Sequence, residues 1–287
     1  MAAQTRQVKV VTDSAADIPP EIAADLDITV VPQLVHMGGK TYHSGVDLDP
    51  EQFYRELAAT RSVTTTSFAS LDYFTRAYIG VVERGYDVCA VHLASKLSGT
   101  FNAALMASTA DGVPPDAVSL VDSRAVSMAQ GWVAIVAAEA ARTGKTLAEV
   151  TAVAEDAVSR TALYAALDTL EYVMKSGRLS RFPGTVGTML SVKPILTLRP
   201  NGEIAIAERV RTRSRAVEHM MQMALEHGPL ERVAVMHAAD PEIAGHVKQM
   251  LLDAGVSEPI LVSIVGPVLG THAGPGAVGI CALRAGE

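Results

Sequence analysis

The sequence predicts an α/β protein in which an N-terminal α/β/α domain with a parallel sheet is followed by a smaller α+β domain with a mostly antiparallel sheet. In the first half, short β-branched runs alternate with helical segments, the pattern of a parallel sheet with helices on both faces. In the second half, Asn201-Gly202 separates two apolar runs, which predicts a hairpin and hence antiparallel pairing. The pattern changes near Ser159–Arg160, so we expect domains at residues 1–160 and 161–287.

Local signals define the elements of the first half. Pro19 and Pro20 open a helix, because proline is tolerated in a first helical turn. Gly38-Gly39 is a hairpin signal, and Asp49 before Pro50 is a helix cap. Thr64–Ser67 is expected to form a loop. The expected strands are 8–11, 28–31, 33–36, 40–42, 88–93 and 118–121, and the expected helices are 19–25, one from 50, 70–84, 100–110, 126–142 and 147–158.

The second half is predicted by the same rules. Lys175–Arg178 is a polar break, and Gly270–Gly276 is expected to be a glycine-rich loop that carries His272. Arg209, Arg211 and Arg213 would share one face of an extended segment. The expected strands are 163–167, 195–198, 204–207, 233–237, 260–265 and 277–283, and the expected helices are 215–227 and 241–254.

Composition narrows the class of protein. The chain has 24 basic and 31 acidic residues, a net charge of −7, so it lacks the cationic surplus of a non-specific nucleic-acid binder. Cys89 and Cys281 lie in short apolar runs and are expected to be buried free thiols. The N-terminus has no apolar signal core, and no apolar run is long enough to span a membrane. We therefore expect a soluble cytoplasmic protein without stable membrane insertion.

Signatures for cofactor and metal chemistry are incomplete. Gly144-Lys145-Thr146 resembles the end of a phosphate loop, but Glu139 stands where the loop needs its first glycine. Gly274–Gly279 matches G-x-G-x-x-G but lies too near the C-terminus to open the helix of a dinucleotide-binding unit. The eight histidines have no metal-ligand spacing. We expect no cofactor and no metal.

Four hydroxyl-rich stretches are candidates for a binding site. Ligands of an open parallel sheet bind outside the carboxyl ends of its strands, and free N–H groups at helix starts attract anions. Helix capping by serine and threonine explains the same pattern, so the residues alone leave both interpretations open. The stretches are Thr12–Ser14, Thr64–Ser67, Ser95–Thr100 and Asp122–Ser123.

Three further residues are candidates on weaker grounds. His272 lies among glycines, which would let the backbone press the imidazole against a ligand. A surface histidine in a turn explains the same residues. Lys175 and Arg178 flank Gly177 and form either a partner site or a pair of solvated loop charges.

Taken together, these motifs resemble the DegV family, the bacterial fatty-acid-binding proteins. They occur in the family's order and cover nearly the whole chain. The resemblance implies a two-domain protein that buries one long-chain fatty acid. It also implies a carrier subunit that presents the carboxylate to a separate fatty acid kinase subunit, whose acyl phosphate feeds phospholipid synthesis. The motifs are Thr12–Ser14, Thr66-Ser67, Ser95–Thr100, Leu170–Tyr172, Gly177–Ser180, Ser191–Ile195 and Gly270–Ala277.

The resemblance also assigns roles to residues. Thr66, Ser67 and Ser98 would hold the carboxylate by hydrogen bonds, with His272 reaching in from the second domain. Arg178 would engage the kinase. Ser95 and Gly99 complete the expected ligand site, and Lys175 completes the expected partner site.

Two other functions remain open at this point. One is a hydrolase or acyltransferase that uses Ser98 or Ser67 with His272, which would require the serine and histidine side chains to lie within hydrogen-bond reach. The other is a sugar- or nucleotide-binding module at the same sheet edge. An aliphatic tunnel leading away from the hydroxyls would argue against it.

Overall fold

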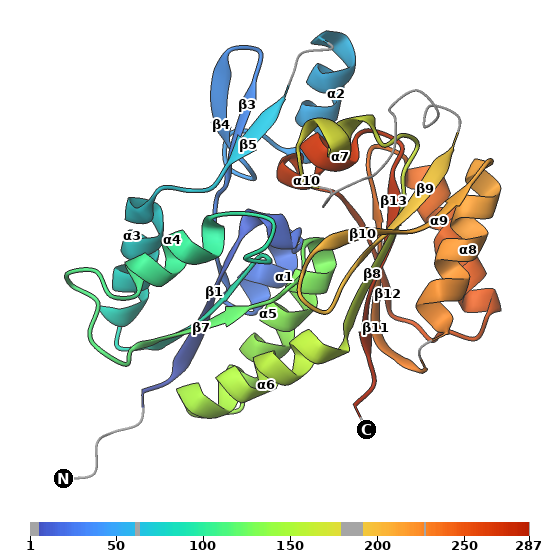
Figure 1. Ribbon diagram of the computed structural model, residues 1–287. Helices are drawn as coiled ribbons and strands as arrows, with labels where there is room; N and C mark the ends of the chain where they lie inside the picture. The colour runs from blue at the N-terminus through green and yellow to red at the C-terminus, as the bar shows by residue number, and fades with distance from the viewer. Residues whose placement is uncertain (1–5, 61–63, 179–191, 227, 287) are drawn as a thin grey trace.

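The computed structural model describes residues 6–60, 64–178, 192–226 and 228–286. Within them the chain forms three sheets (Figure 1). Residues before 160 contribute a four-stranded and a three-stranded sheet, and residues after 160 contribute a six-stranded sheet. We call the four-stranded sheet with its helices the N-lobe and the six-stranded sheet with its helices the C-lobe.

The N-lobe is built on a four-stranded sheet in the order β2-β1-β6-β7, with every pairing parallel. Apolar side chains of α3 and α4 pack on one face, and those of α1, α5 and α6 pack on the other. The parallel α/β/α prediction is therefore confirmed. The strands are β1 (Val8–Asp13), β2 (Thr29–Val31), β6 (Asp87–His92) and β7 (Val118–Asp122). The helices are α1 (Pro20–Asp25), α3 (Leu71–Val82), α4 (Thr100–Ala107), α5 (Ser127–Arg142) and α6 (Leu147–Arg160).

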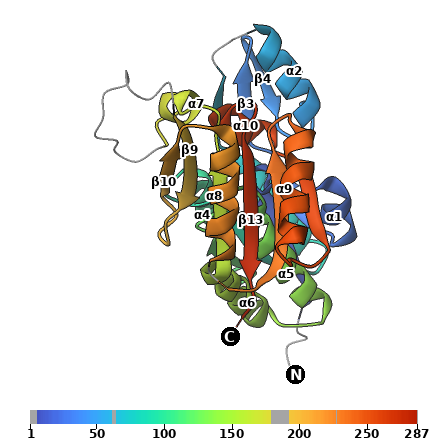
Figure 2. The same ribbon diagram turned by 90° about the vertical axis from the view of Figure 1, so that its right-hand side faces the viewer.

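The C-lobe sheet has the order β10-β9-β8-β13-β11-β12, and only its β11–β12 pair is parallel among the described strands. Helices α8 and α9 cover its outer face (Figure 2). This confirms the mostly antiparallel prediction. The strands are β8 (Thr161–Ala166), β9 (Lys193–Leu198), β10 (Ile204–Val210), β11 (Leu230–His237), β12 (Ile260–Ile264) and β13 (Val278–Arg284). The helices are α7 (Glu171–Lys175), α8 (Arg213–Leu225), α9 (Pro241–Asp253) and α10 (Pro267–Ala273).

A small antiparallel sheet, order β4-β3-β5, lies beside α2 (Pro50–Thr60) and α10 at one end of the molecule (Figure 1). The predicted Gly38-Gly39 hairpin joins β3 (Leu34–Met37) to β4 (Lys40–His43), with both glycines at positive φ. The third strand, β5 (Thr65–Ser67), was expected to be a loop. It is a strand because it pairs with β3, a long-range contact that no local signal reveals.

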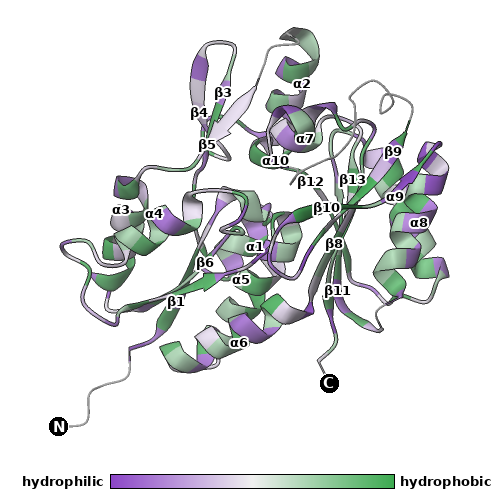
Figure 3. Cartoon of the chain, viewed as in Figure 1, coloured by the Kyte–Doolittle hydropathy of each residue, from purple (hydrophilic) through white to green (hydrophobic). Residues whose placement is uncertain are grey.

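Helix α5 joins the two lobes, and nearly all of its residues are buried. It packs on the N-lobe sheet with one side and on β8 and β13 with the other. Trp132 of α5 donates its indole N–H to the Cys281 carbonyl oxygen, 3.1 Å away on β13. Figure 3 shows the contrast between this largely apolar helix and α6, whose outer residues are polar. The lobes therefore share one core.

The fold corrects one further prediction, the shared face of three arginines, and confirms another, the buried free cysteines. Arg209, Arg211 and Arg213 do not share a face, because β10 ends at Val210 and Arg213 begins α8. Both cysteines are free and buried, as expected. No helix in the described parts of the chain is long and apolar enough to cross a membrane.

Candidate functional site

An apolar cavity of about 110 Å³, which we call the tunnel, lies between the inner face of the C-lobe sheet and the start of α5. Small residues make room for it: Ala165 of β8 lies opposite Gly279 of β13, and a Cβ on Gly279 would be only 3.5 Å from the Ala165 Cβ. Leu163, Met236 and Cys281 line its inner part. Such a lining favours an aliphatic ligand and offers nothing to a sugar or nucleotide.

A second cavity of 340 Å³, which we call the mouth, adjoins the tunnel. Val126, Ile204, Leu269 and His272 line both cavities. The mouth brings together six of the eight residues predicted for the ligand and partner sites: Thr66, Ser67, Ser98, Gly99, Arg178 and His272. It also contains Gln33 and Phe68, which sequence reasoning missed.

His272 lies in the last turn of α10, where a glycine-rich loop was expected. Pro267 occupies the first helical turn, and Gly274 ends the helix at a φ of +76°. A side chain on Gly274 would collide with the Tyr172 ring, since a Cβ would be 2.3 Å from Tyr172 Cδ2. The helix therefore holds the imidazole in a fixed direction, which a flexible loop would not.

The two nitrogens of His272 have different surroundings. Nε2 lies 2.9 Å from Thr66 Oγ1, whereas Nδ1 is buried and has no hydrogen-bond partner among the described residues. Burial, and then the nearby Arg178 guanidinium, lower the pKa of His272 to about 4. The imidazole is therefore neutral at pH 7. A buried, unpaired ring nitrogen costs free energy, which a hydrogen-bonding ligand would recover.

Ser67 has a second histidine as its partner. His36 of β3 places Nε2 2.9 Å from Ser67 Oγ and Nδ1 2.9 Å from Thr41 Oγ1. Thus Thr66 and Ser67, adjacent on β5, each contact an imidazole from a different element. His36 escaped prediction because its contact depends on the β3–β5 pairing.

Gln33 connects the two hydroxyl segments of the mouth. Its amide nitrogen donates to Thr100 Oγ1 at 3.0 Å, and its amide oxygen accepts from the Ala69 N–H at 3.1 Å. Thr100 Oγ1 in turn lies 2.9 Å from Ser98 Oγ. The buried Gln33 side chain therefore sets the position of Ser98 relative to β5.

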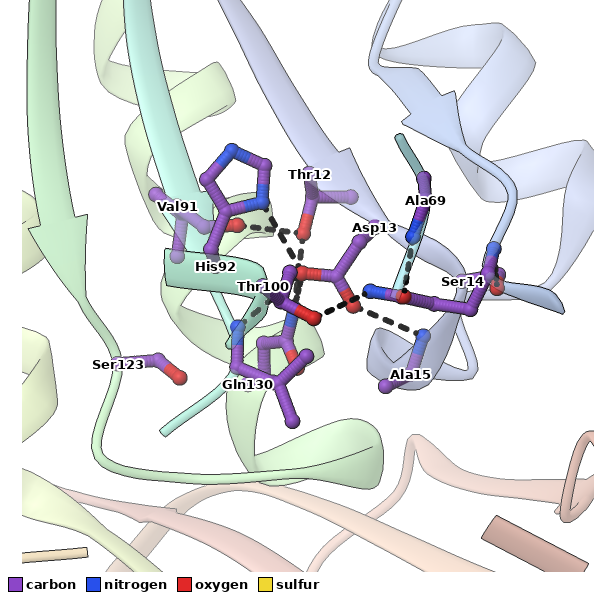
Figure 4. Close-up of polar contacts among 12 residues, drawn as sticks. Thr12, Asp13, Ser14, Ala15, Ala69, Val91, His92, Thr100, Ser123 and Gln130 are labelled. Atoms are coloured by element: carbon purple, nitrogen blue, oxygen red, sulfur yellow. Dashed lines mark hydrogen bonds and ion pairs between the residues drawn. The ribbon is translucent and has the colours of Figure 1, made fainter. Parts of the chain in front are cut away.

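Thr12, Asp13 and Ser123, which were candidates from the hydroxyl-rich stretches, belong to the buried scaffold behind the mouth (Figure 4). Thr12 donates to the Val91 carbonyl oxygen, and Asp13 Oδ2 accepts from His92 and Gln130. Ser123 is bonded to Ala125. These side chains form their hydrogen bonds within the protein. Only two of the four stretches therefore contribute hydroxyl residues to the lining of the mouth.

The remaining predicted residues lie around the mouth. Ser95 does not line it, and its N–H donates to Asp122 Oδ1 at 3.2 Å. Gly99 does line it, and the Phe68 ring approaches so closely that a Cβ on Gly99 would be 2.9 Å from Phe68 Cε1. Leu179, Ser180 and Ser191 of the family motifs lie outside the described residues.

An outer cleft of 550 Å³ adjoins the mouth and shares His272 and Arg178 with it. Lys175 lines this cleft and pairs with Glu171 at 2.6 Å. Arg178 donates to the Ser176 carbonyl oxygen. The two predicted partner-site residues, Lys175 and Arg178, therefore both line the outer cleft, which also includes His272.

Among the described residues, His272 is hydrogen-bonded to neither Ser98 nor Ser67, and the serine–histidine contact of the mouth is the one between Ser67 and His36. Ser98 Oγ bonds to Thr100, and His272 Nε2 contacts Thr66, so no serine–histidine pair joins Ser98 to His272. A histidine with a pKa near 4 is also a weak general base at pH 7.

The fold and the site define a class: two-lobed α/β proteins that enclose an apolar tunnel with a mouth of hydroxyls and histidine. A family model described as an uncharacterised protein of the DegV family matches residues 7–285. The chain therefore belongs to the DegV family. A DegV domain-containing protein of Streptomyces coelicolor is 35% identical over 281 residues, which cover 96% of this chain and 98% of its own. A relative in Mycobacterium tuberculosis is 36% identical over 278 residues, 96% of each chain.

Solved structures agree with this assignment. DegV of Bacillus subtilis, described as a fatty acid binding protein, matches with a TM-score of 0.86 at 31% identity and covers 98% of this chain and 100% of its own. A DegV family protein of Thermus thermophilus, described for its fatty acid binding, matches with a TM-score of 0.87 at 29% identity and covers 97% and 100%.

Proposed function

We propose that this protein binds one long-chain fatty acid, with the acyl tail in the tunnel and the carboxylate in the mouth. The observation that carries the proposal is the apolar tunnel that adjoins a mouth lined by Thr66, Ser67, Ser98 and His272. The binding of fatty acids by the related Bacillus subtilis and Thermus thermophilus proteins supports it.

The energetics assign different roles to the two ends of the ligand. A tail of about 16 carbons, at about 0.8 kcal/mol per buried CH2, supplies on the order of 10 kcal/mol before the costs of binding. A single carboxylate needs few donors, which Thr66, Ser67, Ser98 and His272 can provide. The tail then provides affinity and the mouth fixes the orientation.

We further propose that the bound carboxylate is presented through the outer cleft to a separate kinase subunit, which forms the acyl phosphate for phospholipid synthesis in the cytoplasm. The cleft connects to the mouth at His272 and Arg178, and its two cations exceed its one carboxylate, Glu171, by a single positive charge that would attract a phosphate donor. In this proposal the protein itself is not catalytic and uses no cofactor.

Lipid analysis of the purified protein tests the first proposal. Native mass spectrometry should show a mass increase equal to one fatty acid, and extraction should identify a free acid. An apo mass that persists after supplementation with palmitate and oleate would contradict it. Turnover of acyl esters that is lost in Ser98→Ala would instead support the hydrolase.

His272→Ala should weaken fatty-acid binding without unfolding the protein. In this proposal the His272 imidazole donates a hydrogen bond to the carboxylate, and a hydrogen bond to a charged group contributes about 1.5–3 kcal/mol, or roughly 10- to 150-fold in affinity. Fluorescent fatty-acid titration measures the change. His246→Ala, on the exposed surface of α9, is the matched control. Equal affinity of the wild type, His272→Ala and His246→Ala for the fatty acid would show that His272 does not contribute to binding.

Arg178→Ala should reduce phosphorylation by a kinase much more than it reduces fatty-acid loading, although Arg178 also lines the mouth. Charges at an interface act mainly on association rate and are screened by salt, so the defect should shrink as ionic strength rises. Acyl-phosphate formation is measured with saturating fatty acid across a salt series. Arg142→Ala, whose side chain pairs with Asp25 on the N-lobe, is the control. Equal rates for Arg178→Ala and wild type would separate Arg178 from kinase docking.

A further inference from the structure

A separate cavity of 570 Å³ lies between the lobes, away from the mouth. Its wall is formed by the end of β7, the end of α6, the β9–β10 hairpin and the end of β13, elements that face one another across the lobes in Figure 1. Leu163 and Leu198 line both this interlobe cavity and the tunnel. A ligand here would be separated from the tunnel by these two side chains. The proposed function assigns it no role.

Three arginines from different segments face the interlobe cavity: Arg124 after β7, Arg199 after β9 and Arg284 at the end of β13. The Nε of Arg284 is buried and has no hydrogen-bond partner among the described residues. The Arg124 guanidinium likewise makes no hydrogen bond or ion pair with any of the described residues. Arg199 pairs with Glu203, with Nη1 and Oε2 3.4 Å apart.

Two carboxylates, Asp122 and Glu155, also line the cavity, so its three arginines leave a formal surplus of one positive charge. Asp122 Oδ1 accepts the backbone N–H groups of Ser95 and Arg124, so it holds the loop. Glu155 is the other carboxylate in the wall. The hydroxyls of Ser159 and Thr161 donate to carbonyl oxygens of α6. Guanidinium N–H groups are therefore the donors left for a ligand.

The size and lining of the cavity define the ligand class. Small-molecule sites occupy roughly 300–1,000 Å³, so this cavity exceeds the needs of a bare inorganic ion. Val158, Leu163, Leu198 and Pro200 supply an apolar wall beside the arginines. This combination fits a molecule with an anionic head and a compact apolar body.

We propose that the interlobe cavity binds a small organic anion, whose carboxylate or phosphate lies between Arg124 and Arg284 and whose apolar part rests on Leu163 and Leu198. Arg124 belongs to the N-lobe and Arg284 to the C-lobe. The bound anion therefore connects the lobes by charge-assisted hydrogen bonds and stabilises the folded protein.

Phenyl phosphate and benzoate test the proposal, because they carry the two head groups on one apolar body, and benzyl alcohol is the neutral analogue. Calorimetry and thermal unfolding are measured on the whole protein at constant ionic strength. We expect at least one anion to bind with 1:1 stoichiometry and to raise the unfolding temperature, whereas benzyl alcohol does neither. The preferred anion distinguishes a phosphate site from a carboxylate site.

Substitutions of the cavity arginines test where the anion binds. Arg284→Gln and Arg124→Gln should each weaken binding about tenfold or more. Arg124 is exposed, so its replacement tests the site even if Arg284→Gln fails to fold. Arg215→Gln, on the exposed surface of α8, should change nothing. Unchanged binding in Arg124→Gln, loss of binding only in Arg178→Gln, or no binding of either anion would overturn the proposal.

Discussion

Ala165→Leu should reduce the affinity for palmitate by more than 100-fold. The Ala165 methyl lines the tunnel opposite Gly279, and the three added carbon atoms would occupy the space of the acyl chain. Excluding about four CH2 groups, at about 0.8 kcal/mol each, removes about 3 kcal/mol of binding. Decanoate, whose chain extends less far, should lose much less affinity. The palmitate-to-decanoate affinity ratio, measured by displacement of a fluorescent fatty acid, is the decisive quantity.

Controls separate a blocked tunnel from a damaged core. Ala207→Leu makes the same change at an exposed position of β10 and should bind palmitate like the wild type. Gly279→Ala adds one methyl group from the opposite strand and should produce a smaller loss in the same direction. Thermal unfolding checks that each variant is folded. An unchanged chain-length preference in a folded Ala165→Leu variant would place the acyl chain elsewhere.

The sequence predicted the sheets well because their strands carry local signals. The run Val88–Leu93 is apolar throughout, as a strand buried on both faces should be, and β6 is indeed buried along almost its whole length. Asn201-Gly202 specified the β9–β10 hairpin in the same local way. Such signals depend on neighbouring residues, so no knowledge of the tertiary structure is needed.

The α10 helix could have been predicted, but the glycines around His272 favoured a loop. Pro267 near the start and Gly274 just after the end are the ordinary marks of a short helix. His36 and Gln33 had no comparable signal. Their contacts with Ser67, Thr100 and Ala69 join segments that only the folded chain brings together.

The hydroxyl-rich stretches show that position near a strand end does not by itself predict which side chains line the mouth. The same rule selected Thr12 and Ser98, but Thr12 lies inside β1, which continues to Asp13, whereas Ser98 follows the end of β6. Thr12 is fully buried and bonded to Val91, whereas Ser98 lines the mouth. The difference depends on where the strand ends and on the neighbouring strand, because Thr12 lies within β1 and donates to Val91 of β6.

Asp17→Asn should stabilise the folded protein above pH 7 and remove part of its pH dependence. Asp17 Oδ2 accepts from the Ser127 hydroxyl at 2.8 Å, and Oδ1 accepts from the Gly266 N–H at 3.0 Å, directly before α10. Burial raises the pKa of this carboxyl to about 7, despite the lowering effect of the two hydrogen bonds. Asparagine keeps the shape and an acceptor for Gly266 but carries no charge.

The sign of the effect follows from proton binding. Between the ordinary pKa of 3.8 and about 7, the folded state keeps a proton on Asp17 that the unfolded state has released. Raising the pH through this window therefore lowers the free energy of unfolding, and the loss is complete above pH 7. The shift corresponds to at most about 4 kcal/mol, and to less here because the residue is partly accessible.

Urea unfolding of wild type and Asp17→Asn from pH 4 to pH 9 measures this contribution. The difference in unfolding free energy should grow in favour of the variant between pH 4 and 7 and then stay constant. Asp25→Asn, at an exposed acid of α1, is the matched control and should show no such growth. Subtracting the two curves removes the contributions that both proteins share. Parallel curves for wild type and Asp17→Asn would mean that Asp17 is ionised in the folded protein. Its hydrogen bonds to Ser127 and Gly266 would then be charge-assisted. They would hold α10 against the N-lobe more strongly at neutral pH.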